Sequence, residues 1–389
     1  MKVVVVAYGS RGDVEPCAAA ARELARRGHD VRMTAPPDML GFVESVGIAA
    51  VAYGADTRGQ TEAFANLVGT VPNPVGALPA VLADLTETWT SKSATLASLS
   101  DGADLLLAGL NEQELAANVA ELQGIPMAGL HFFPPQILSF GPLYSSLRQQ
   151  AAAAQRQALG LPDAAACGAP SVEIQGYDEF CVPGVAASWG GAAARRPFVG
   201  ALTLQLPSGD DDEALSWIAA GEPPVCFGLG STPIAAPADL VATIGGACAL
   251  LGERALICSG PNDFRDVPSF DHVKVVRSVN HAAVLPACRA VVHHGGAGTT
   301  AAGLRAGIPA LVLWLWLDQP MWAAALEQLG LGGSRQFAAT TAESLAADLG
   351  AILTADCVTR AREVAARMTP AADSAVKTAD LLESLAEAR

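Results

Sequence analysis

Residues 293–300 read His-His-Gly-Gly-Ala-Gly-Thr-Thr, and no other stretch of this 389-residue chain is as informative. The apolar segment 290–292 before it has the pattern of a strand, and the segment 300–305 has the pattern of a helix. Glycines in a strand-to-helix turn let backbone N–H groups approach a ligand closely, and the positive end of the helix points to the same place. The stretch therefore predicts an anion site, and phosphates are the anions that such turns bind.

Strand-like and helix-like segments alternate along both halves of the chain. The predicted strands are 2–7, 31–34, 49–51, 105–108 and 127–130 in the first half, and 225–229, 255–258, 273–276, 290–292 and 310–313 in the second. The first strand is rich in valine, which is typical of a parallel strand buried on both faces. The alternation predicts an α/β protein with two doubly wound, Rossmann-like domains facing across a cleft.

The length and one polar segment predict where the domains divide. A chain of 389 residues is too long for one ordinary hydrophobic core. Residues 206–213 are polar and turn-rich, so we expect a linker there that also caps a helix starting near Ala214. The alternative interpretation of its aspartates is a metal-binding pair. The predicted domains are therefore 1–205 and 214–370, followed by a last helical segment at 371–389.

Composition restricts the class of protein and its partners. Apolar residues make up 51% of the chain and charged residues 16%, which is typical of a globular protein. The net charge of −15 argues against nucleic acid as a partner. The eight cysteines form no CxxC pair, and a strand begins at residue 2, so we expect no signal peptide and a cytoplasmic location. The apolar run at 308–317 is far shorter than the roughly twenty residues of a membrane span, although peripheral membrane contact stays open.

The loop after the first strand reads Gly-Ser-Arg-Gly-Asp-Val-Glu-Pro at 9–16. It does not have the GxGxxG spacing, and no acidic residue suited to a ribose ends the second strand, so no dinucleotide fingerprint is present. An ionised Asp13 could accept a proton from a hydroxyl group as a general base. The alternative interpretation of Asp13 is a simple helix cap.

Two further patterns accompany the 293–300 stretch in the second half. Phe-Gly-Leu-Gly-Ser-Thr at 227–232 follows a buried strand, so it is either a phosphate loop containing Ser231 or a structural turn. Asp318 and Gln319 begin a helix, where they either bind sugar hydroxyls or act as a cap. No third ligand lies at a suitable spacing from His293 and His294, so we expect no metal site.

These motifs resemble those of the family 1 glycosyltransferases of GT-B architecture, in particular the bacterial enzymes that decorate glycopeptide antibiotics and actinobacterial glycopeptidolipids. The motifs are GSRGDVEP at 9–16, FGLGS at 227–231, VNHAAVLP at 279–286, HHGGAGTT at 293–300 and DQP at 318–320. They span most of the chain. The resemblance implies an acceptor-binding first domain, a second domain that binds a nucleotide sugar, and a last helix, 371–389, that packs back on the first domain.

The resemblance also implies roles for single residues. Asp13 corresponds to the catalytic base, acting without a histidine partner. The residues that correspond to the diphosphate-binding set are Ser10, Arg11, Ser231, His294, Gly296, Gly298 and Thr299. Those that correspond to the sugar-binding and base-binding positions are Asp318 and Gln319, and Val279 and His281. Ser278 departs from the family pattern, because many relatives have an aromatic ring there that stacks on the base.

The implied activity is the metal-independent, inverting transfer of a hexose or deoxyhexose from a UDP or dTDP sugar, with no other cofactor. The acceptor would be a hydroxyl of a lipid, lipopeptide or natural product. Asn111, His131 and Phe132 are candidate acceptor-binding residues, although the aromatic residues of 55–80 and 131–150 are equally consistent with a core. Two alternative functions are a nucleotide-sugar 2-epimerase and a non-catalytic helper of another glycosyltransferase.

Overall fold

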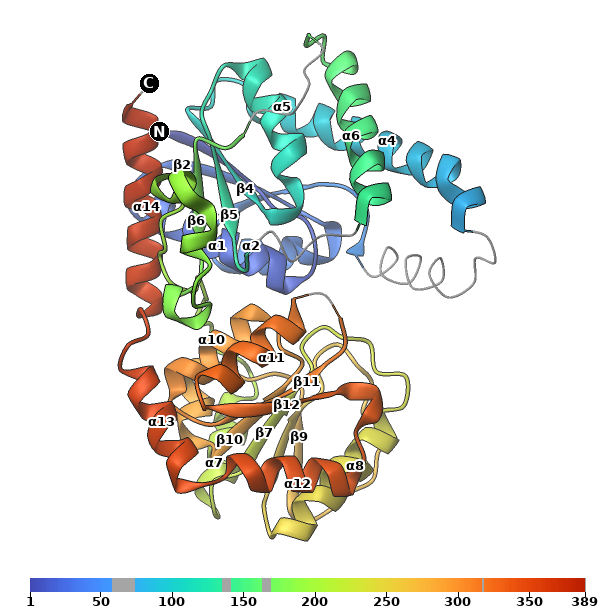
Figure 1. Ribbon diagram of the computed structural model, residues 1–389, viewed down its shortest axis with the longest axis vertical. Coiled ribbons are helices and arrows are strands. Elements are labelled where there is room, and N and C mark those ends of the chain that lie inside the picture. Colours follow the sequence, from blue (N-terminus) through green and yellow to red (C-terminus); the bar gives the residue numbers. More distant parts are fainter. Residues whose placement is uncertain (58–73, 135–140, 163–168, 317, 389) are drawn as a thin grey trace. The chain divides into compact units, whose positions relative to one another are not determined.

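The computed structural model describes residues 1–57, 74–134, 141–162, 169–316 and 318–388, and it divides into two compact units (Figure 1). The first unit comprises Met1–Gly176, Gly184–Leu202 and Ala371–Arg389, and the second comprises Tyr177–Pro183 and Thr203–Pro370. The predicted boundary at 205 lies close to one of these divisions. The short segment Tyr177–Pro183 differs from the prediction, because it belongs to the second unit.

The first unit is built on a six-stranded parallel sheet. Its strands are β1 (Lys2–Val6), β2 (Asp30–Ala35), β3 (Ala49–Ala52), β4 (Leu105–Gly109), β5 (Met127–His131) and β6 (Val172–Gln175). Their order is β3-β2-β1-β4-β5-β6, so the direction of winding reverses between β1 and β4. At such a switch point the loops after the two central strands diverge to opposite faces and leave room for a ligand.

Valines of β1 show why this sheet is buried on both faces. Val3, Val4, Val5 and Val6 are all fully buried. Val4 and Val6 belong to the core that packs against α4 (Pro74–Leu99), α5 (Gln113–Gln123) and α6 (Gly141–Ala158). Successive side chains of a strand point to opposite faces, so Val3 and Val5 face the other layer, which contains α1 (Arg11–Arg26). Figure 1 shows α14 (Ala371–Glu387) on one side of the sheet and α4, α5 and α6 on the other.

Helix α6 corrects one expectation. The Ala/Gln-rich stretch at 149–157 predicts an exposed helix, but Ala151, Ala152 and Gln155 are buried. The Gln155 side chain donates to the Ser93 hydroxyl at 2.8 Å and accepts from Asn118 at 2.7 Å. Alanine lets α6 approach α4 closely, and the buried amide is satisfied by these bonds.

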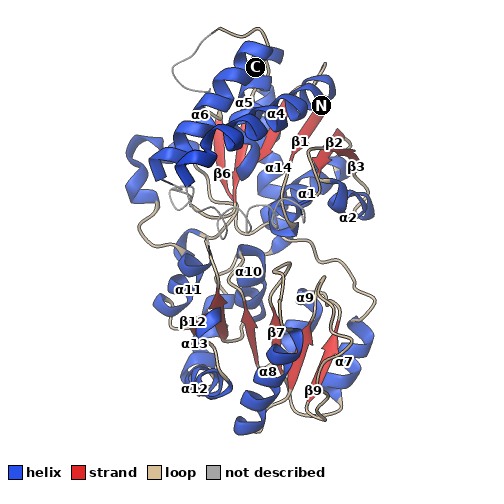
Figure 2. Cartoon of the chain, turned by 90° about the vertical axis from the view of Figure 1, so that its right-hand side faces the viewer, coloured by secondary structure: helices blue, strands red, loops and turns tan. Residues whose placement is uncertain are grey.

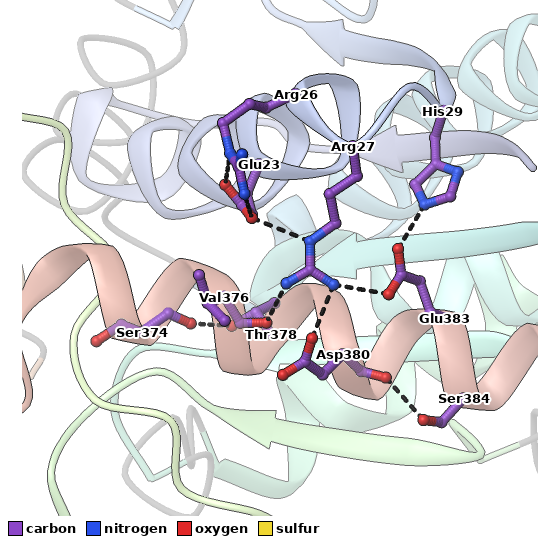
Figure 3. A network of polar contacts seen from close by, with 10 residues as sticks. All are labelled: Glu23, Arg26, Arg27, His29, Ser374, Val376, Thr378, Asp380, Glu383 and Ser384. Atoms are coloured by element: carbon purple, nitrogen blue, oxygen red, sulfur yellow. Dashed lines mark hydrogen bonds and ion pairs between the residues drawn. The ribbon is translucent and has the colours of Figure 1, made fainter.

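Helix α14 (Ala371–Glu387) packs against α1 in the first unit, as Figure 3 shows. Arg27 follows α1 and donates to Asp380 at 2.7 Å and to Glu383 at 2.6 Å, both on α14. Glu383 also contacts the ring of His29 at 2.7 Å. Two basic groups after α1 and two carboxylates on α14 therefore fix the last helix to the first unit.

The second unit repeats the architecture. Its strands are β7 (Val225–Gly228), β8 (Ala255–Cys258), β9 (Val273–Val276), β10 (Ala290–His293), β11 (Ala310–Trp314) and β12 (Gly332–Gln336). The order β12-β11-β10-β7-β8-β9 is the same winding pattern, with its switch point between β7 and β10. The helices are α7 (Asp211–Ala219), α8 (Pro237–Leu251), α9 (His281–Val284), α10 (Ala297–Ala306), α11 (Gln319–Gln328), α12 (Ala342–Ile352) and α13 (Ala355–Ala365). Figure 2 shows these helices around the strands of the second sheet.

Two doubly wound, parallel α/β sheets confirm the predicted fold class. The expected strands are all present, and β6 and β12 are additional edge strands that the sequence pattern did not indicate. In the part of the chain that the structure describes, no helix combines the length and the apolar character needed to cross a bilayer.

Candidate active site

Asp13 lies in the first turn of α1, directly after the loop that follows β1. The helix begins at Arg11, and Ser10 and Asp13 cap it. The backbone N–H and the hydroxyl of Ser10 donate to Oδ2 of Asp13 at 2.8 and 3.0 Å. Gly9 has a φ of +132°, and a Cβ at this position would overlap the carboxyl group of Asp13. The glycine therefore makes room for the folded-back carboxylate.

Asn111 binds the second oxygen of the same carboxylate. It lies in the short helix η2 (Leu110–Glu112) after β4, and its amide nitrogen donates to Oδ1 of Asp13 at 3.0 Å. It also reaches the carbonyl oxygen of Tyr8, at 3.3 Å. The loops after β1 and β4 meet because these strands are neighbours at the switch point. The structure thus brings together the candidate base and a residue predicted to contact the acceptor.

The electrostatic environment makes Asp13 a stronger base than an ordinary aspartate. Burial raises the pKa of Asp13 from 3.8 to about 6, while the hydrogen bonds from Ser10 and Asn111 act in the opposite direction. The group is still mostly ionised at neutral pH, because its pKa remains below 7. It is both a cap and a candidate base, so the two interpretations of the sequence are compatible.

A buried ion pair, which the sequence analysis missed, lies beside Asn111. Lys92 of α4 donates to Oε1 of Glu112 at 2.8 Å, and the hydroxyl of Tyr53 donates to Oε2 at 2.8 Å. The ammonium group of Lys92 lies 3.3 Å from the ring centroid of Tyr8. Both side chains of the ion pair are 5% exposed. The cluster therefore fixes η2 and the end of β1, the two segments that surround Asp13.

Arg11, which was predicted to bind the diphosphate, contacts side chains of its own unit in the structure. Its guanidinium pairs with Glu15 at 2.7 Å and lies 4.9 Å from the ring centroid of Phe42, all within the first unit. The Arg11 side chain is exposed, and a salt bridge of an exposed side chain contributes little to stability, so these contacts leave the arginine able to rearrange.

The aromatic candidates of the first unit are buried. His131 ends β5 and is 3% exposed, and burial lowers its pKa to about 4. Neither ring nitrogen of His131 has a hydrogen-bond partner within the described part of the chain. Phe132 is also buried and packs edge-to-face on Phe133 at 5.2 Å. Burial of both phenylalanines favours the core interpretation. The remaining apolar candidates lie outside the described residues. They are Phe64, Leu67, Val68, Phe140 and the side chain of Tyr144.

In the second unit, His293 is a structural residue. The sequence places two adjacent histidines at the start of the 293–300 stretch, but His293 is fully buried at the end of β10. Its Nδ1 accepts a hydrogen bond from the N–H of Gly295 at 3.0 Å. Burial lowers the pKa of His293 to about 3, so the ring is neutral. The hydrogen bond sets the turn that follows the strand.

His294 is the histidine that belongs to the turn itself. Its ring lies between Gly230, which follows β7, and Gly296. A Cβ at Gly230 would lie 2.7 Å from its Cε1, and one at Gly296 would lie 2.5 Å from its Nε2. Burial lowers the pKa of His294 to about 4, so at neutral pH the ring can donate a hydrogen bond but carries no charge. This contact occurs where β7 and β10 are neighbours, at the second switch point.

The first turn of α10 has the properties of an anion site. Gly296 is its N-cap, and its first turn contains no acidic residue. Gly298 is exposed, with open space where a Cβ would point, and Thr299 is partly buried. The first N–H groups of a helix have no partner within the helix, and the dipole attracts negative charge there. Ser231, after β7, is exposed in the neighbouring loop.

Gln319 lies against the same turn. A Cβ at Gly295, whose φ is +93°, would lie 3.1 Å from Cα of Gln319. Oε1 of Gln319 accepts hydrogen bonds from the N–H groups of Leu315 and Trp316 at 2.7 and 3.2 Å. A sugar hydroxyl would therefore have to accept a hydrogen bond from the amide nitrogen of Gln319. Asp318 is partly buried at the N-cap of α11.

The predicted base-binding residues lie in the loop after β9. Val279 is partly buried, and His281 is the first residue of α9, whose N-cap is Asn280. The predicted linker 206–213 contains Asp210, the N-cap of α7, which begins at Asp211 rather than near Ala214, and its side chains bind this loop. Among residues 1–57, 74–134, 141–162, 169–316 and 318–388, no three His, Cys, Asp or Glu side chains are grouped so that they could hold a metal ion.

Two family models match the chain. Residues 3–88 match the glycosyltransferase family 28 N-terminal domain, and residues 256–387 match the C-terminal domain of erythromycin biosynthesis protein CIII-like proteins. The first match contains Asp13, and the second contains the 277–300 region and Gln319.

Whole-chain relatives agree with these matches. The chain is 54% identical to an uncharacterized glycosyltransferase of Mycobacterium tuberculosis, over 99% of both chains. It is 31% identical to the vancomycin aglycone glucosyltransferase of Amycolatopsis orientalis, over 98% of this chain and 97% of the relative. The fold is similar to that of the Streptomyces sp. SF2575 glycosyltransferase SsfS6, solved in complex with thymidine diphosphate. For that structure the TM-score is 0.66 and the identity 21%, over 100% of this chain and 99% of the other. With its two Rossmann-like units and these full-length relatives, the chain belongs to the family 1 glycosyltransferases of the GT-B fold.

Proposed function

We propose that the chain transfers a sugar, with inversion, from a nucleoside diphosphate sugar to a hydroxyl group of a hydrophobic acceptor. The observation that carries this proposal is the carboxylate of Asp13, which Ser10 and Asn111 bind and whose pKa burial raises to about 6. Such a group is ionised at neutral pH and is a stronger base than a free aspartate, which suits a general base.

In the proposed reaction, Asp13 takes the proton of the acceptor hydroxyl while the oxygen bonds to the anomeric carbon. The bond between that carbon and the diphosphate breaks on the opposite face, and the diphosphate leaves with the negative charge. The N–H groups at the start of α10 and the neutral ring of His294 stabilise this charge as fixed dipoles. In this proposal Gly296, Gly298, Thr299 and Ser231 would contact the same diphosphate. This set supports a leaving group stabilised without a metal ion.

The donor is proposed to be a UDP or dTDP sugar, used as a co-substrate with no other cofactor. The thymidine diphosphate bound to the similar SsfS6 structure supports this class of ligand. Val279 and His281 would bind the base, and Asp318 and the amide nitrogen of Gln319 the hexose or deoxyhexose. Ser10 and Arg11 would contact the diphosphate from the first unit.

The acceptor is proposed to be a lipid, lipopeptide or natural-product hydroxyl bound by the first unit. The relative named for the vancomycin aglycone supports an acceptor of the natural-product class. Asn111 contacts the candidate base directly, and His131 offers two ring nitrogens without partners among the described residues. All seven cysteines in the described ranges are free thiols, which supports a cytoplasmic location.

The test compares Asp13→Asn with Asp30→Asn, an exposed aspartate of the same unit. Sugar transfer from UDP and dTDP sugars is measured on a panel of hydrophobic acceptors. We expect Asp13→Asn to lose a factor of about 10²–10⁴ in rate while it still binds the nucleoside diphosphate. Equal activity of the two variants would remove Asp13 from the mechanism. A changed sugar in the absence of any acceptor would instead identify an epimerase.

A further inference from the structure

The loop that follows β9 is held by two carboxylates from the start of α7. Oδ2 of Asp210 accepts hydrogen bonds from the backbone N–H groups of Arg277 at 2.8 Å and Ser278 at 3.1 Å. Oδ1 of Asp211 accepts one from the N–H of Asn280 at 2.7 Å. Both acceptors are carboxylates, and hydrogen bonds to charged groups are stronger than those between neutral groups.

This loop needs such support because β9 is an edge strand. Strand β8 holds it from one side, where the N–H of Gly260 donates to the carbonyl of Arg277 at 2.9 Å. No strand of the sheet lies on the other side of β9 within the described residues. Arg277 and Ser278 are exposed, so without the aspartates their N–H groups would bind only water. The carboxylates take the place of the missing strand.

A hydrogen bond in the opposite direction also joins the two segments, and a bond within 208–211 positions its donor, Ser208. Oδ2 of Asp211 accepts from the N–H of Ser208 at 2.8 Å. The hydroxyl of Ser208 donates to the carbonyl of Ser278 at 2.7 Å. Residues 208–211 and 277–280 are therefore interlocked. Val279 lies between Ser278 and Asn280, whose N–H groups are both held.

We propose that Asp210 and Asp211 are positioning residues for the base of the nucleoside diphosphate. They fix residues 277–280, so that the backbone of Val279 is presented to the base in one geometry. The inference rests on the proposed function, in which Val279 binds the base. The diphosphate site at the start of α10 is built by other loops, those after β7 and β10. Loss of the aspartates therefore weakens binding of the base without weakening binding of the phosphates.

The experiment uses the full chain and three alanine variants, Asp210→Ala, Asp211→Ala and the control Asp212→Ala. Asp212 is the adjacent, exposed aspartate of the same helical turn, so the control removes the same charge. Isothermal titration gives the Kd of UDP, of dTDP and of inorganic pyrophosphate for each protein. We expect the Kd of the preferred nucleotide to rise at least about tenfold in Asp210→Ala and Asp211→Ala. We expect the Kd of pyrophosphate to stay within about twofold in every variant.

A second measurement tests the inference if an alanine variant is too unstable for titration. Amide hydrogen exchange at 277–280 should be faster in Asp210→Asn and Asp211→Asn than in Asp212→Asn, with the rest of the sheet unchanged. Unchanged nucleotide affinity in both alanine variants, equal weakening of pyrophosphate, or an equal effect of Asp212→Ala would overturn the inference alone. A wild-type protein that binds pyrophosphate but neither nucleotide would overturn the proposed donor as well.

Discussion

The side chain of Asn111 donates to Oδ1 of Asp13 at 3.0 Å, across 98 residues of sequence. This bond favours the charged carboxylate and lowers the pKa of Asp13, whereas burial raises it. Because Asn111 comes from the loop after β4 and Asp13 from the loop after β1, the sheet topology creates the contact. Asn111 thus adjusts the pH at which the candidate base becomes active.

Replacing Asn111 with alanine should move the acidic limb of the pH profile upward. In the wild type we expect kcat/KM to rise with pH and level off above about 6, the pKa of Asp13. Loss of one hydrogen bond to the charged form should shift this limb by about one pH unit, which corresponds to ~1.4 kcal/mol. The measurement is kcat/KM between pH 5 and 9. A loss of rate by the same factor at every pH would show that Asn111 does not act through the pKa of Asp13.

Acidification should destabilise the fold through three histidines and stabilise it through one aspartate. Burial lowers the pKa values of His131, His293 and His294 to about 4, 3 and 4. Near pH 5 each is neutral in the native state and protonated in the unfolded state, so stability falls as the pH drops below about 6.5. Asp13 has the opposite sign, because its raised pKa lets the native state bind a proton between pH 6 and 4.

Near pH 5 the unfolded state therefore binds about two more protons than the native state at these four groups. The three histidines bind three protons only in the unfolded state, and Asp13 binds one only in the native state. The free energy of unfolding should therefore change by about 3 kcal/mol per pH unit through them. Denaturant unfolding between pH 7 and 5 measures it. His131→Leu should make the slope shallower by roughly 1.4 kcal/mol per pH unit, and Asp13→Asn should make it steeper by a similar amount. Parallel slopes in the wild type and His131→Leu would contradict the assignment.

Two glycines of the anion loop should respond differently to alanine. Gly295 has a φ of +93°, and its new Cβ would lie 2.8 Å from Cγ1 of Val312, so Gly295→Ala should cost about 1–3 kcal/mol of stability. Gly298 has helical backbone and open space at its Cβ position, so Gly298→Ala should be neutral or slightly stabilising. The melting temperatures of the two variants test the difference. Equal melting temperatures would mean that the turn can relax around a side chain.

The attachment of α14 should depend on Arg27 and not on Arg26. Arg27 binds Asp380 and Glu383 of α14, whereas the hydrogen bonds drawn from Arg26 in Figure 3 reach Glu23 of its own helix. Arg27→Met should therefore accelerate amide exchange along α14 and lower stability by about 1–3 kcal/mol. Arg26→Met is the matched control, with an effect below about 0.5 kcal/mol. Equal exchange rates in the two variants would show that apolar packing alone holds the helix.

The sequence predicted the central strands because their side chains are buried on both faces. Valine-rich β1 and the Ala290–His293 strand need no knowledge of their neighbours to be recognised. Strand β12 was missed because it reads Gly-Gly-Ser-Arg-Gln, with no β-branched residue. Gly332 is there because a Cβ would collide with the carbonyl of Ala310 on the adjacent strand. That requirement arises only from the three-dimensional pairing.

The parts of the site that depend on neighbouring residues in the sequence were predicted, and those that depend on three-dimensional contacts were not. Local motifs indicated Asp13 and the 293–300 turn, since glycines and a following helix are adjacent in sequence. The roles of Lys92 and Asp210 depend on partners far along the chain, Glu112 and the loop after β9. The polar composition of 206–213 predicted a linker. Composition alone does not reveal which backbone N–H groups a carboxylate will bind in the folded chain. His293 and His294 are adjacent in sequence, yet only the strand register places one inside and one in the turn.

The docking of α14 on α1 also constrains the order of events during synthesis. Domains commonly form as they leave the ribosome, beginning with the N-terminal one. Here the sheet that is translated first lacks α14 until residues 371–387 have been synthesised, so Arg27 and His29 cannot contact Asp380 and Glu383 before then. The second unit, whose residues end at Pro370, can mature while the first is still incomplete. A premature stop near codon 371 would leave a complete second unit and a first unit that lacks α14.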